Sequence, residues 1–193
     1  MNEGSRPGPR HTVLVGLMGS GKTSVGRRIA GASLPFVDTD AEIERKEGRS
    51  VRDIFAADGE PAFRALEEDA VAASLAAAAA SVIATGGGAM ESAATRMLVN
   101  RARADGRALV VWLRAEPAEL ASRVGRSTHR PLLDGDPAGR LGELAVARAA
   151  NYSAVADLVV DTDGLSPAEV AERVRVALHV AGQDGGVGNG AHG

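Results

Sequence analysis

Residues 16–23, GLMGSGKT, follow the apolar run VLV directly and constrain the fold more than any other stretch of the chain. The pattern G-x-x-x-x-G-K-[ST] between a strand and a helix is typical of a phosphate-binding loop, because its glycines let backbone N–H groups and a helix N-terminus face a phosphate. In such a loop Lys22 contacts the β- and γ-phosphates, and the Thr23 hydroxyl ligates Mg²⁺. The sequence therefore predicts a nucleoside triphosphate site. The alternative is a glycine-rich turn that binds nothing.

Short apolar runs alternate with longer amphipathic patterns along the chain. Strands are expected at residues 12–17, 34–38, 82–85, 108–113 and 157–161. Helices are expected at residues 22–31, 40–46, 61–80, 92–104, 117–124, 139–154 and 167–181. Most strand candidates are almost continuously apolar, as in parallel sheets that helices cover on both faces. This order predicts an α/β domain with three layers, α/β/α, around a mainly five-stranded parallel sheet.

Length and composition limit the class of protein further. The 193 residues fit one domain, since domains commonly have ~100–200 residues. We expect a disordered arm at residues 1–10, a single domain at 11–180 and a disordered glycine-rich tail at 181–193. The net charge of −3 gives no support to nucleic-acid binding, and the absence of cysteine excludes a disulfide scaffold. Without a long apolar segment or a secretory signal, the sequence predicts a soluble cytoplasmic protein with no membrane partner.

Two carboxylates stand at the end of the second expected strand, in FVDTDAEIE. Asp38 and Asp40 point to the same side of an extended chain, at the sheet edge where open α/β sheets bind ligands. One of them could hold metal-bound water, and the other could accept the proton of an attacking hydroxyl. The alternative is a T-x-x-E capping box from Thr39 to Glu42, in which the acids only favour the start of a helix.

Arg64 and three glycines supply candidates for an acceptor site. The planar guanidinium of Arg64 matches a substrate carboxylate, whereas its alternative role is an ion pair with Glu67 or Glu68 on its own helix. Glycines 86–88 follow an expected strand and leave a backbone that a ligand can approach closely, although they also fit a bare turn.

The polar segment at about residues 123–137 fits a mobile lid between two helices. Arg130 within it could reach a transferred phosphoryl group in the manner of an arginine finger, and Arg148 on the next helix is a further anion ligand. Taken singly, each arginine also fits a solvated surface position. No N-K-x-D motif for guanine follows the phosphate-binding loop, so a small-molecule kinase is favoured over a GTPase.

Taken in order, these stretches resemble the shikimate kinases, which belong to the nucleoside-monophosphate-kinase-like P-loop enzymes. The resemblance covers roughly residues 12–180 and rests on GLMGSGKT, DTD, GRSVRDIF to DGEPAFR, TGGG, RPLL and the R-x-x-x-Y at Arg148 to Tyr152. The first motif is shared by many nucleotide-binding proteins, whereas the whole series is much more specific. Two stretches depart from the family pattern. DTDGLSP, before the adenine position Pro167, lacks an asparagine and basic residues, and SRVGR has Ser122 where relatives often have an arginine.

The resemblance implies transfer of phosphate from ATP to the 3-hydroxyl of shikimate, a step of chorismate and aromatic amino-acid biosynthesis, with Mg²⁺ as cofactor. The catalytic residues that it implies are Lys22, Asp40 and Arg130. ATP would contact Gly19, Ser20, Gly21, Lys22, Thr23, Ser24, Arg123, Arg130 and Pro167. Shikimate would contact Asp40, Phe55, Phe63, Arg64, Gly86, Gly87, Gly88 and Arg148. Thr23, together with Asp38 acting through water, would hold the metal.

Two other functions compete with this interpretation. A kinase of another small polyol acid, such as gluconate, would share the fold, but the set of acid, arginines and glycines around the acceptor favours shikimate. A non-catalytic nucleotide-binding regulator would be expected to lose Lys22, Asp40 or Arg130, and all three are present. Nothing in the sequence demands a partner chain, so a monomer is expected.

Overall fold

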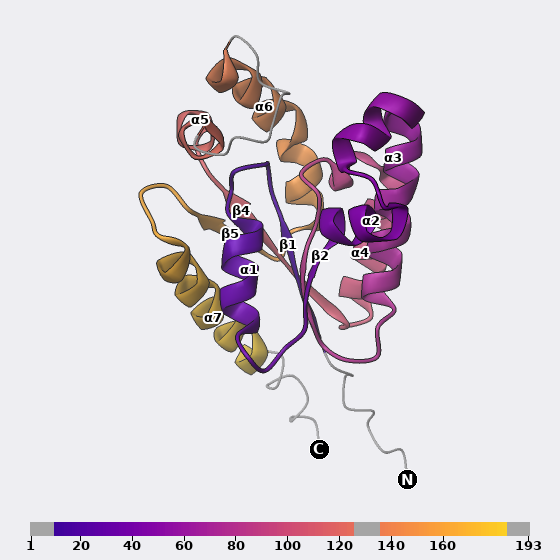
Figure 1. The fold of residues 1–193 in the computed structure, drawn as a ribbon. Coiled ribbons are helices and arrows are strands. Elements are labelled where there is room, and N and C mark those ends of the chain that lie inside the picture. Colours follow the sequence, from indigo (N-terminus) through magenta and orange to yellow (C-terminus); the bar gives the residue numbers. More distant parts are fainter. Residues whose placement is uncertain (1–9, 126–135, 185–193) are drawn as a thin grey trace, which may run out of the picture.

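Five parallel strands form one sheet in the centre of the molecule (Figure 1). They are β1 His11–Val15, β2 Phe36–Asp38, β3 Val82–Ala84, β4 Ala108–Arg114 and β5 Leu158–Asp161. Their order is β2-β3-β1-β4-β5, and every pairing is parallel. The predicted five-stranded parallel sheet is therefore confirmed.

The computed structural model describes residues 10–125 and 136–184. Three predictions lie wholly or mostly outside these residues: the arm at 1–10, the tail at 181–193, and the lid with Arg130. Within the described part, the tail prediction is wrong at its start, because helix α7 continues to Asp184.

Helices cover both faces of the sheet (Figure 1). One face packs against α1 and α7, and the other packs mainly against α3, α4 and α6. The helical elements are α1 Lys22–Ala30, α2 Thr39–Glu47, α3 Val51–Leu75, η1 Ala89–Glu91 (a 3-10 turn), α4 Ala93–Ala104, α5 Pro117–Gly125, α6 Pro137–Val155 and α7 Pro167–Asp184. The structure thus has the three layers that the sequence predicted.

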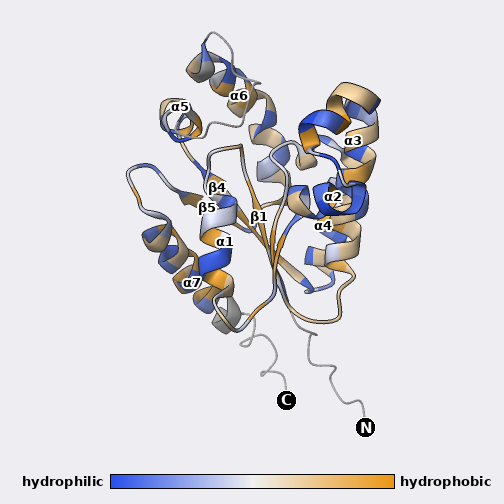
Figure 2. Ribbon diagram, in the orientation of Figure 1, coloured by the Kyte–Doolittle hydropathy of each residue, from blue (hydrophilic) through white to orange (hydrophobic). Residues whose placement is uncertain are grey.

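The central strand β1 shows why the sheet sequence is continuously apolar. Leu14 packs in the core beneath α1 and α7, whereas Val13 and Val15 pack in the core on the opposite face. All three side chains are fully buried. Figure 2 shows the result as hydrophobic colour along the central strands, with hydrophilic residues on the helices around them. A strand that is covered on both faces cannot alternate polar and apolar residues.

The structure corrects the start of the helix predicted at residues 61–80. Helix α3 begins at Val51, where the Ser50 side chain accepts a hydrogen bond from the Asp53 amide. Its geometry is then interrupted at Gly59 (φ 83°, ψ 172°). Pro61 therefore does open a helical segment, as predicted, but an earlier segment precedes it.

The predicted C-terminal turns of this helix, at residues 76–80, are wrong. Helix α3 ends at Leu75, and the Ala77 amide donates to the Ser74 carbonyl at 3.4 Å in a tighter turn. The chain must then return to the sheet, where the Ser81 carbonyl accepts a hydrogen bond from the Thr12 amide at 2.9 Å. Alanine side chains bury too little surface to hold further helical turns against this requirement.

Two helical glycines provide a matched test of packing between α1 and the sheet. A β-carbon at Gly26 in α1 would lie 2.5 Å from Phe36 Cε2 and 3.2 Å from Leu14 Cδ1. At Gly142 in α6, its closest neighbour would be Pro117 Cβ at 3.8 Å. We expect Gly26→Ala to lower the free energy of unfolding by about 1–3 kcal/mol through overpacking. Gly142→Ala should raise it by about 0.5–1 kcal/mol through helix propensity.

Urea unfolding of both variants beside the unmodified protein measures this difference. A Gly26→Ala variant as stable as the Gly142→Ala variant would contradict the tight packing of α1 on β1 and β2.

Candidate active site

Three connections meet at the carboxyl ends of the neighbouring strands β1, β3 and β2. GLMGSGKT follows β1, β2 ends at Asp38, and glycines 86–88 follow β3. The end of β3 is fixed to β1 because Thr85 donates from both its amide and its hydroxyl to the Leu14 carbonyl, each at 3.1 Å. The fold thus brings the predicted phosphate-binding and acceptor residues to one edge of the sheet, where open α/β sheets bind ligands.

The phosphate-binding loop is shaped by glycine backbones and by Lys22. Gly16, Gly19 and Gly21 have φ values of 140°, 82° and 91°, which side chains of L-residues rarely allow. Lys22 Nζ donates to the carbonyls of Gly16 at 2.7 Å and Leu17 at 2.8 Å. Because β1 precedes the loop and α1 begins at Lys22, the predicted context of the motif is confirmed.

Thr23 and Asp38 lie together beside this loop. The Thr23 hydroxyl donates to Asp38 Oδ2 at 2.7 Å, although the two residues come from different elements. Hydroxyl and carboxylate oxygens are ligands that Mg²⁺ accepts, and Mg²⁺ usually completes its shell with water and substrate phosphates. The pair therefore fits the metal predicted here. Among residues 10–125 and 136–184, no group of three or more His, Asp or Glu side chains is arranged so that it could hold a metal ion by itself.

The capping box proposed for Thr39 and Glu42 is wrong. Helix α2 begins one residue earlier, so Asp38 is the N-cap and accepts from the Ala41 amide at 3.4 Å. The fully buried Thr39 hydroxyl instead accepts a hydrogen bond from the Gly86 amide at 3.0 Å. Thr39 thus ties the DTD stretch to the glycine turn, a role that the sequence analysis missed.

Each of the three glycines after β3 faces a different neighbour. A β-carbon at Gly86 would lie 2.6 Å from Asp40 Oδ1, and one at Gly87 would lie 3.1 Å from the Met18 amide of the phosphate-binding loop. At Gly88 it would lie 2.5 Å from Nη2 of Arg64. The glycines are therefore closely surrounded by the acidic and basic side chains of α2 and α3 and by the backbone of the phosphate-binding loop.

Arg64 is paired with carboxylates on every side. Its Nε and Nη2 donate to Glu60 at 3.2 and 2.9 Å, its Nη1 donates to Glu67, and its Nη2 donates to Glu91 at 3.1 Å. The intrahelical ion pair with Glu67 that the sequence offered as the alternative role is present. Arg64 nevertheless also faces the glycine turn. Its side chain therefore forms the intrahelical ion pair and lies at the predicted acceptor site.

Arg148 reaches the same turn from α6. Its Nη1 donates to the Gly87 carbonyl at 3.1 Å, and its Nη2 donates to Glu91 at 2.8 Å. The Tyr152 hydroxyl donates to the same Gly87 carbonyl at 2.5 Å. The structure thus brings together Arg64 and Arg148, which lie far apart in the sequence, through the common partner Glu91.

Glu67 is the most strongly perturbed acid of this region. Its side chain is almost fully buried, and burial raises the pKa of Glu67 to about 7, even though neighbouring Arg64 acts in the opposite direction. The charge of Asp40 adds to the rise. From the sequence, Glu67 is expected only as an ion-pair partner within its helix, because nothing local shows that the carboxylate turns toward Gly86 and Asp40.

Phe55 and Phe63 support this region from the side of α3. Their ring centroids lie 4.5 Å apart, and Phe63 is buried in a small core with Ile43 and Ile54. The Arg64 guanidinium lies 5.8 Å from the centroid of the Phe63 ring. Phe63 therefore packs beneath Arg64, so its contact with a ligand remains a prediction.

The residues predicted to hold adenine lie near the end of β5. Arg123 donates from Nη1 to the Thr162 hydroxyl at 3.0 Å and from Nη2 to the Thr162 carbonyl at 2.6 Å. The chain then leads to exposed Pro167 at the start of α7. Thr162, which anchors Arg123, was not among the predicted residues.

Comparison with known proteins decides the family. The model of the shikimate kinase family matches residues 18–179. Shikimate kinase from Thermobifida fusca is 46% identical over 171 residues, which is 88% of this chain and 95% of that protein. The chain belongs to the shikimate kinase family.

Solved structures agree with this family membership. The shikimate kinase of Acinetobacter baumannii, solved in complex with shikimate, matches with a TM-score of 0.82 and 32% identity, covering 91% of this chain and 96% of that one. A gluconokinase from Sinorhizobium meliloti matches with a TM-score of 0.52 and 22% identity, covering 92% of this chain and 99% of that one. The gluconokinase shares the fold alone, so the comparisons favour the shikimate kinases over the gluconate alternative.

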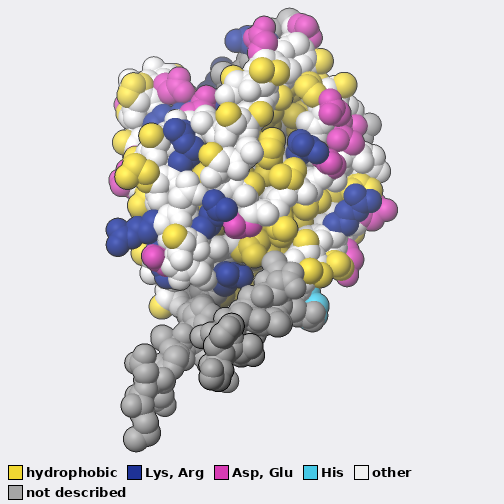
Figure 3. Space-filling model, turned by 180° about the vertical axis from the view of Figure 1, so that it is seen from behind, with side chains coloured by type: hydrophobic (Ala, Val, Ile, Leu, Met, Phe, Trp, Pro, Cys, Tyr) yellow, Lys and Arg dark blue, Asp and Glu magenta, His cyan; other side chains and the backbone are white. Residues whose placement is uncertain are grey.

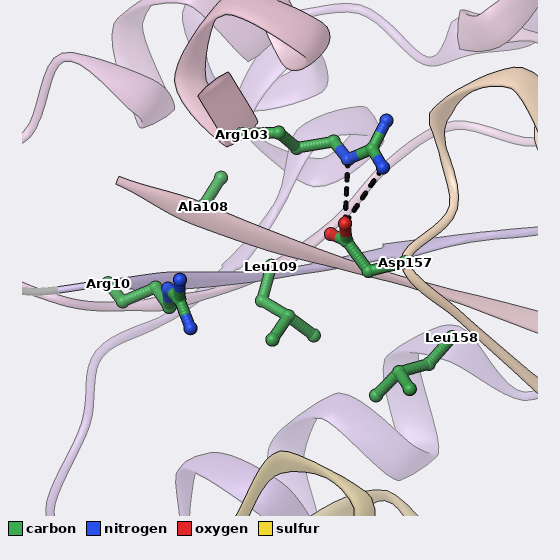
Figure 4. A pocket seen from close by; sticks show the side chains of 6 residues that line it. All are labelled: Arg10, Arg103, Ala108, Leu109, Asp157 and Leu158. Atoms are coloured by element: carbon green, nitrogen blue, oxygen red, sulfur yellow. Dashed lines mark hydrogen bonds and ion pairs between the residues drawn. The ribbon is translucent and has the colours of Figure 1, made fainter. Parts of the chain in front are cut away.

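Two cavities lie at opposite edges of this shikimate kinase fold. One of about 500 Å³ borders the phosphate-binding loop, β4, α5 and α6, and its lining includes Ser20, Trp112 and Tyr152. Another of about 210 Å³ lies where β4 and β5 begin, between Arg10, Leu109 and the ion pair of Arg103 with Asp157 (Figure 4). The smaller cavity contains none of the predicted site residues.

The surface adds little that bears on other ligands. On the face in Figure 3, arginine and lysine side chains lie apart from one another among acidic and hydrophobic ones, without a continuous basic band in the described residues. None of the described helices combines the length and the apolar character that crossing a membrane requires.

The raised pKa of Glu67 predicts a pH-dependent stability. Because the folded state holds this proton more tightly than the unfolded state, the contribution of Glu67 is fully present below about pH 4.5 and is lost as pH rises through about 7. Relative to the unmodified protein, Glu67→Gln should therefore gain up to about 3 kcal/mol of unfolding free energy between pH 5 and 8.

Urea unfolding at several pH values tests this expectation. Asp69→Asn removes a carboxylate from an exposed position on the same helix and controls for net charge. A difference between the Glu67→Gln variant and the unmodified protein that stays constant over this pH range would show that Glu67 does not titrate there.

Proposed function

We propose that this member of the shikimate kinase family transfers the γ-phosphoryl group of ATP to the 3-hydroxyl of shikimate. The product would be shikimate 3-phosphate, an intermediate of chorismate and aromatic amino-acid biosynthesis. The observation that carries the proposal is the placement of Asp40, Arg64 and Arg148 around one glycine turn that touches the phosphate-binding loop. An acceptor that carries a carboxylate at one end and hydroxyls at the other matches this arrangement.

The acceptor would bind between the two arginines and Asp40. Arg64 and Arg148 provide guanidinium donors for its carboxylate, a planar match that lysine does not offer. Asp40 lies beside Gly86, 2.6 Å from the position of a β-carbon there, and would accept a hydrogen bond from the reacting hydroxyl. The related enzyme from Acinetobacter baumannii was solved with shikimate bound, which supports shikimate as the acceptor here.

The donor half would bind ATP on the phosphate-binding loop. Loop amides and Lys22 would hold the phosphates, while Arg123 and Pro167 would flank adenine and Arg130 would approach the γ-phosphate. Thr23 and Asp38 would hold Mg²⁺, which neutralises charge on the phosphates when it is bound. Such transfer depends mainly on positioning and charge stabilisation, so Asp40 would chiefly orient the hydroxyl before it takes up the proton. We propose a monomer that acts in the cytoplasm.

A coupled assay of ADP release tests the proposed activity. With ATP and Mg²⁺, we expect turnover with shikimate and none with gluconate or without an acceptor, and excess EDTA should abolish it. Turnover that prefers gluconate, or ADP release that does not depend on the acceptor, would contradict the proposal while leaving the phosphate-binding loop intact.

The role of Asp40 has its own test. We expect Asp40→Asn to lower kcat with shikimate by about 100-fold or more, because the amide cannot accept the proton. The KM for ATP should stay within about threefold, since Asp40 faces the acceptor half and contributes nothing to uniform ATP binding.

The control for this variant is Glu42→Gln, which neutralises a carboxylate paired with Arg45 on the same helix. Steady-state kinetics of both variants, with thermal melts to confirm folding, gives the comparison. Activity of the Asp40→Asn variant within threefold of the unmodified enzyme would show that another group serves the hydroxyl.

A further inference from the structure

The carboxylate of Glu91 lies between the two arginines that were assigned to the substrate carboxylate. One oxygen, Oε2, accepts from Arg64 Nη2 at 3.1 Å and from Arg148 Nη2 at 2.8 Å. Glu91 ends η1, three residues after Gly88 in the chain. The clamp predicted for an external carboxylate is therefore closed by a carboxylate of the chain itself.

The contacts of Arg64 indicate which of its carboxylate partners a substrate carboxylate could replace. Four of the five N–H groups of its guanidinium donate to carboxylates, so a further carboxylate that binds Arg64 through two hydrogen bonds must replace one of them. The Glu67 side chain is 2% exposed and held in the core, whereas Glu60 is 62% exposed and pairs with Arg64 alone. Glu91 is 37% exposed and contacts both arginines. Of these three carboxylates, Glu91 is therefore the one whose replacement gives a ligand contact with both guanidinium groups.

The charges around Arg64 and Arg148 also favour replacement of Glu91 over the binding of an additional anion. Two arginines stand among the carboxyl groups of Asp40, Glu60, Glu67 and Glu91. A further anion that bound Arg64 and Arg148 beside Glu91 would meet a like charge at close range, which costs binding energy. Withdrawal of Glu91 into solvent would remove that repulsion.

Both arginines have other anchors that would keep them in place without Glu91. Arg64 remains tied to buried Glu67, and Arg148 remains tied to the Gly87 carbonyl. Glu91 also pairs through a single oxygen, and the buried Arg148 Nε has no hydrogen-bond partner in the described structure. A substrate carboxylate that uses two oxygens would thus satisfy the clamp better than Glu91 does.

We propose that Glu91 is an internal carboxylate that occupies the two-arginine clamp until the substrate carboxylate replaces it, and that Glu91 thereby sets the affinity of the acceptor site. This inference rests on the proposed function. Glu91 lowers affinity, because each binding event must first break its pairs with Arg64 and Arg148. It also selects against weakly binding small anions, since these must compete with a group that is always present.

Calorimetric titration of shikimate into the unmodified enzyme, the Glu91→Gln variant and the Glu60→Gln variant tests the proposal. The Glu60→Gln variant is the matched control, because it also removes a carboxylate from Arg64 but leaves the bridge to Arg148 intact. We expect Glu91→Gln to lower the Kd for shikimate about three- to tenfold, and Glu60→Gln to change it less than about twofold. The KM for shikimate should fall with the Kd, while the KM for ATP should stay unchanged.

A second titration separates this inference from the proposed function. Benzoate carries a carboxylate on a ring without hydroxyls, and its Kd should fall by a similar factor in the Glu91→Gln variant. The enzyme could fail to phosphorylate shikimate and still bind benzoate more tightly after Glu91→Gln. That result would contradict the proposed function but support the inference that Glu91 is displaced by a ligand carboxylate. A Kd for both ligands that is unchanged or raised by Glu91→Gln would overturn the inference, because Glu91 would then only position the arginines.

Discussion

The close packing of other elements against glycines 86–88 determines the geometry of the whole site. A β-carbon at these positions would collide with Asp40, crowd the backbone of the phosphate-binding loop, or collide with Arg64. The hydroxyl of Thr39, the first residue of α2, accepts a hydrogen bond from the Gly86 amide of this turn. The glycine turn thus touches the phosphate-binding loop through Gly87 and the side chains of Asp40 and Arg64 through its other two glycines.

What the sequence could predict followed from local signals. The parallel sheet, the strand and helix around GLMGSGKT, and the position of Asp38 and Asp40 at the end of β2 depend on patterns within a few residues. The sheet and these positions are as predicted, whereas the ligand roles of the residues stay predictions. Thr39, Glu67 and Glu91 could not be found in this way, because their roles depend on neighbours that only the fold supplies. The same reason explains the helix errors: a proline marked one start, but packing against α2 added the segment from Val51.

The proposed binding of an anion by a chain with net charge −3 depends on how Arg64 is held. Its guanidinium is surrounded by acids, one of which is buried, so the arginine is fixed in direction before any ligand binds. A buried ion pair contributes little net stability, because desolvation offsets the attraction between the charges. The ion pairs of Arg64 instead orient its side chain. The entropy cost of ordering this long side chain therefore falls on folding and not on ligand binding.

The proposed ATP site and the proposed acceptor site are built from different parts of the chain, the first mainly from backbone and the second mainly from side chains. The donor half consists of backbone amides, glycine conformations and Lys22, which recognise phosphates in any nucleotide. The acceptor half consists of side chains from α2, α3, η1 and α6, whose identity can change without altering the sheet. A gluconokinase can therefore retain the fold at 22% identity. Because a fold does not by itself fix the substrate, the proposed selectivity for shikimate depends on the side chains around the glycine turn.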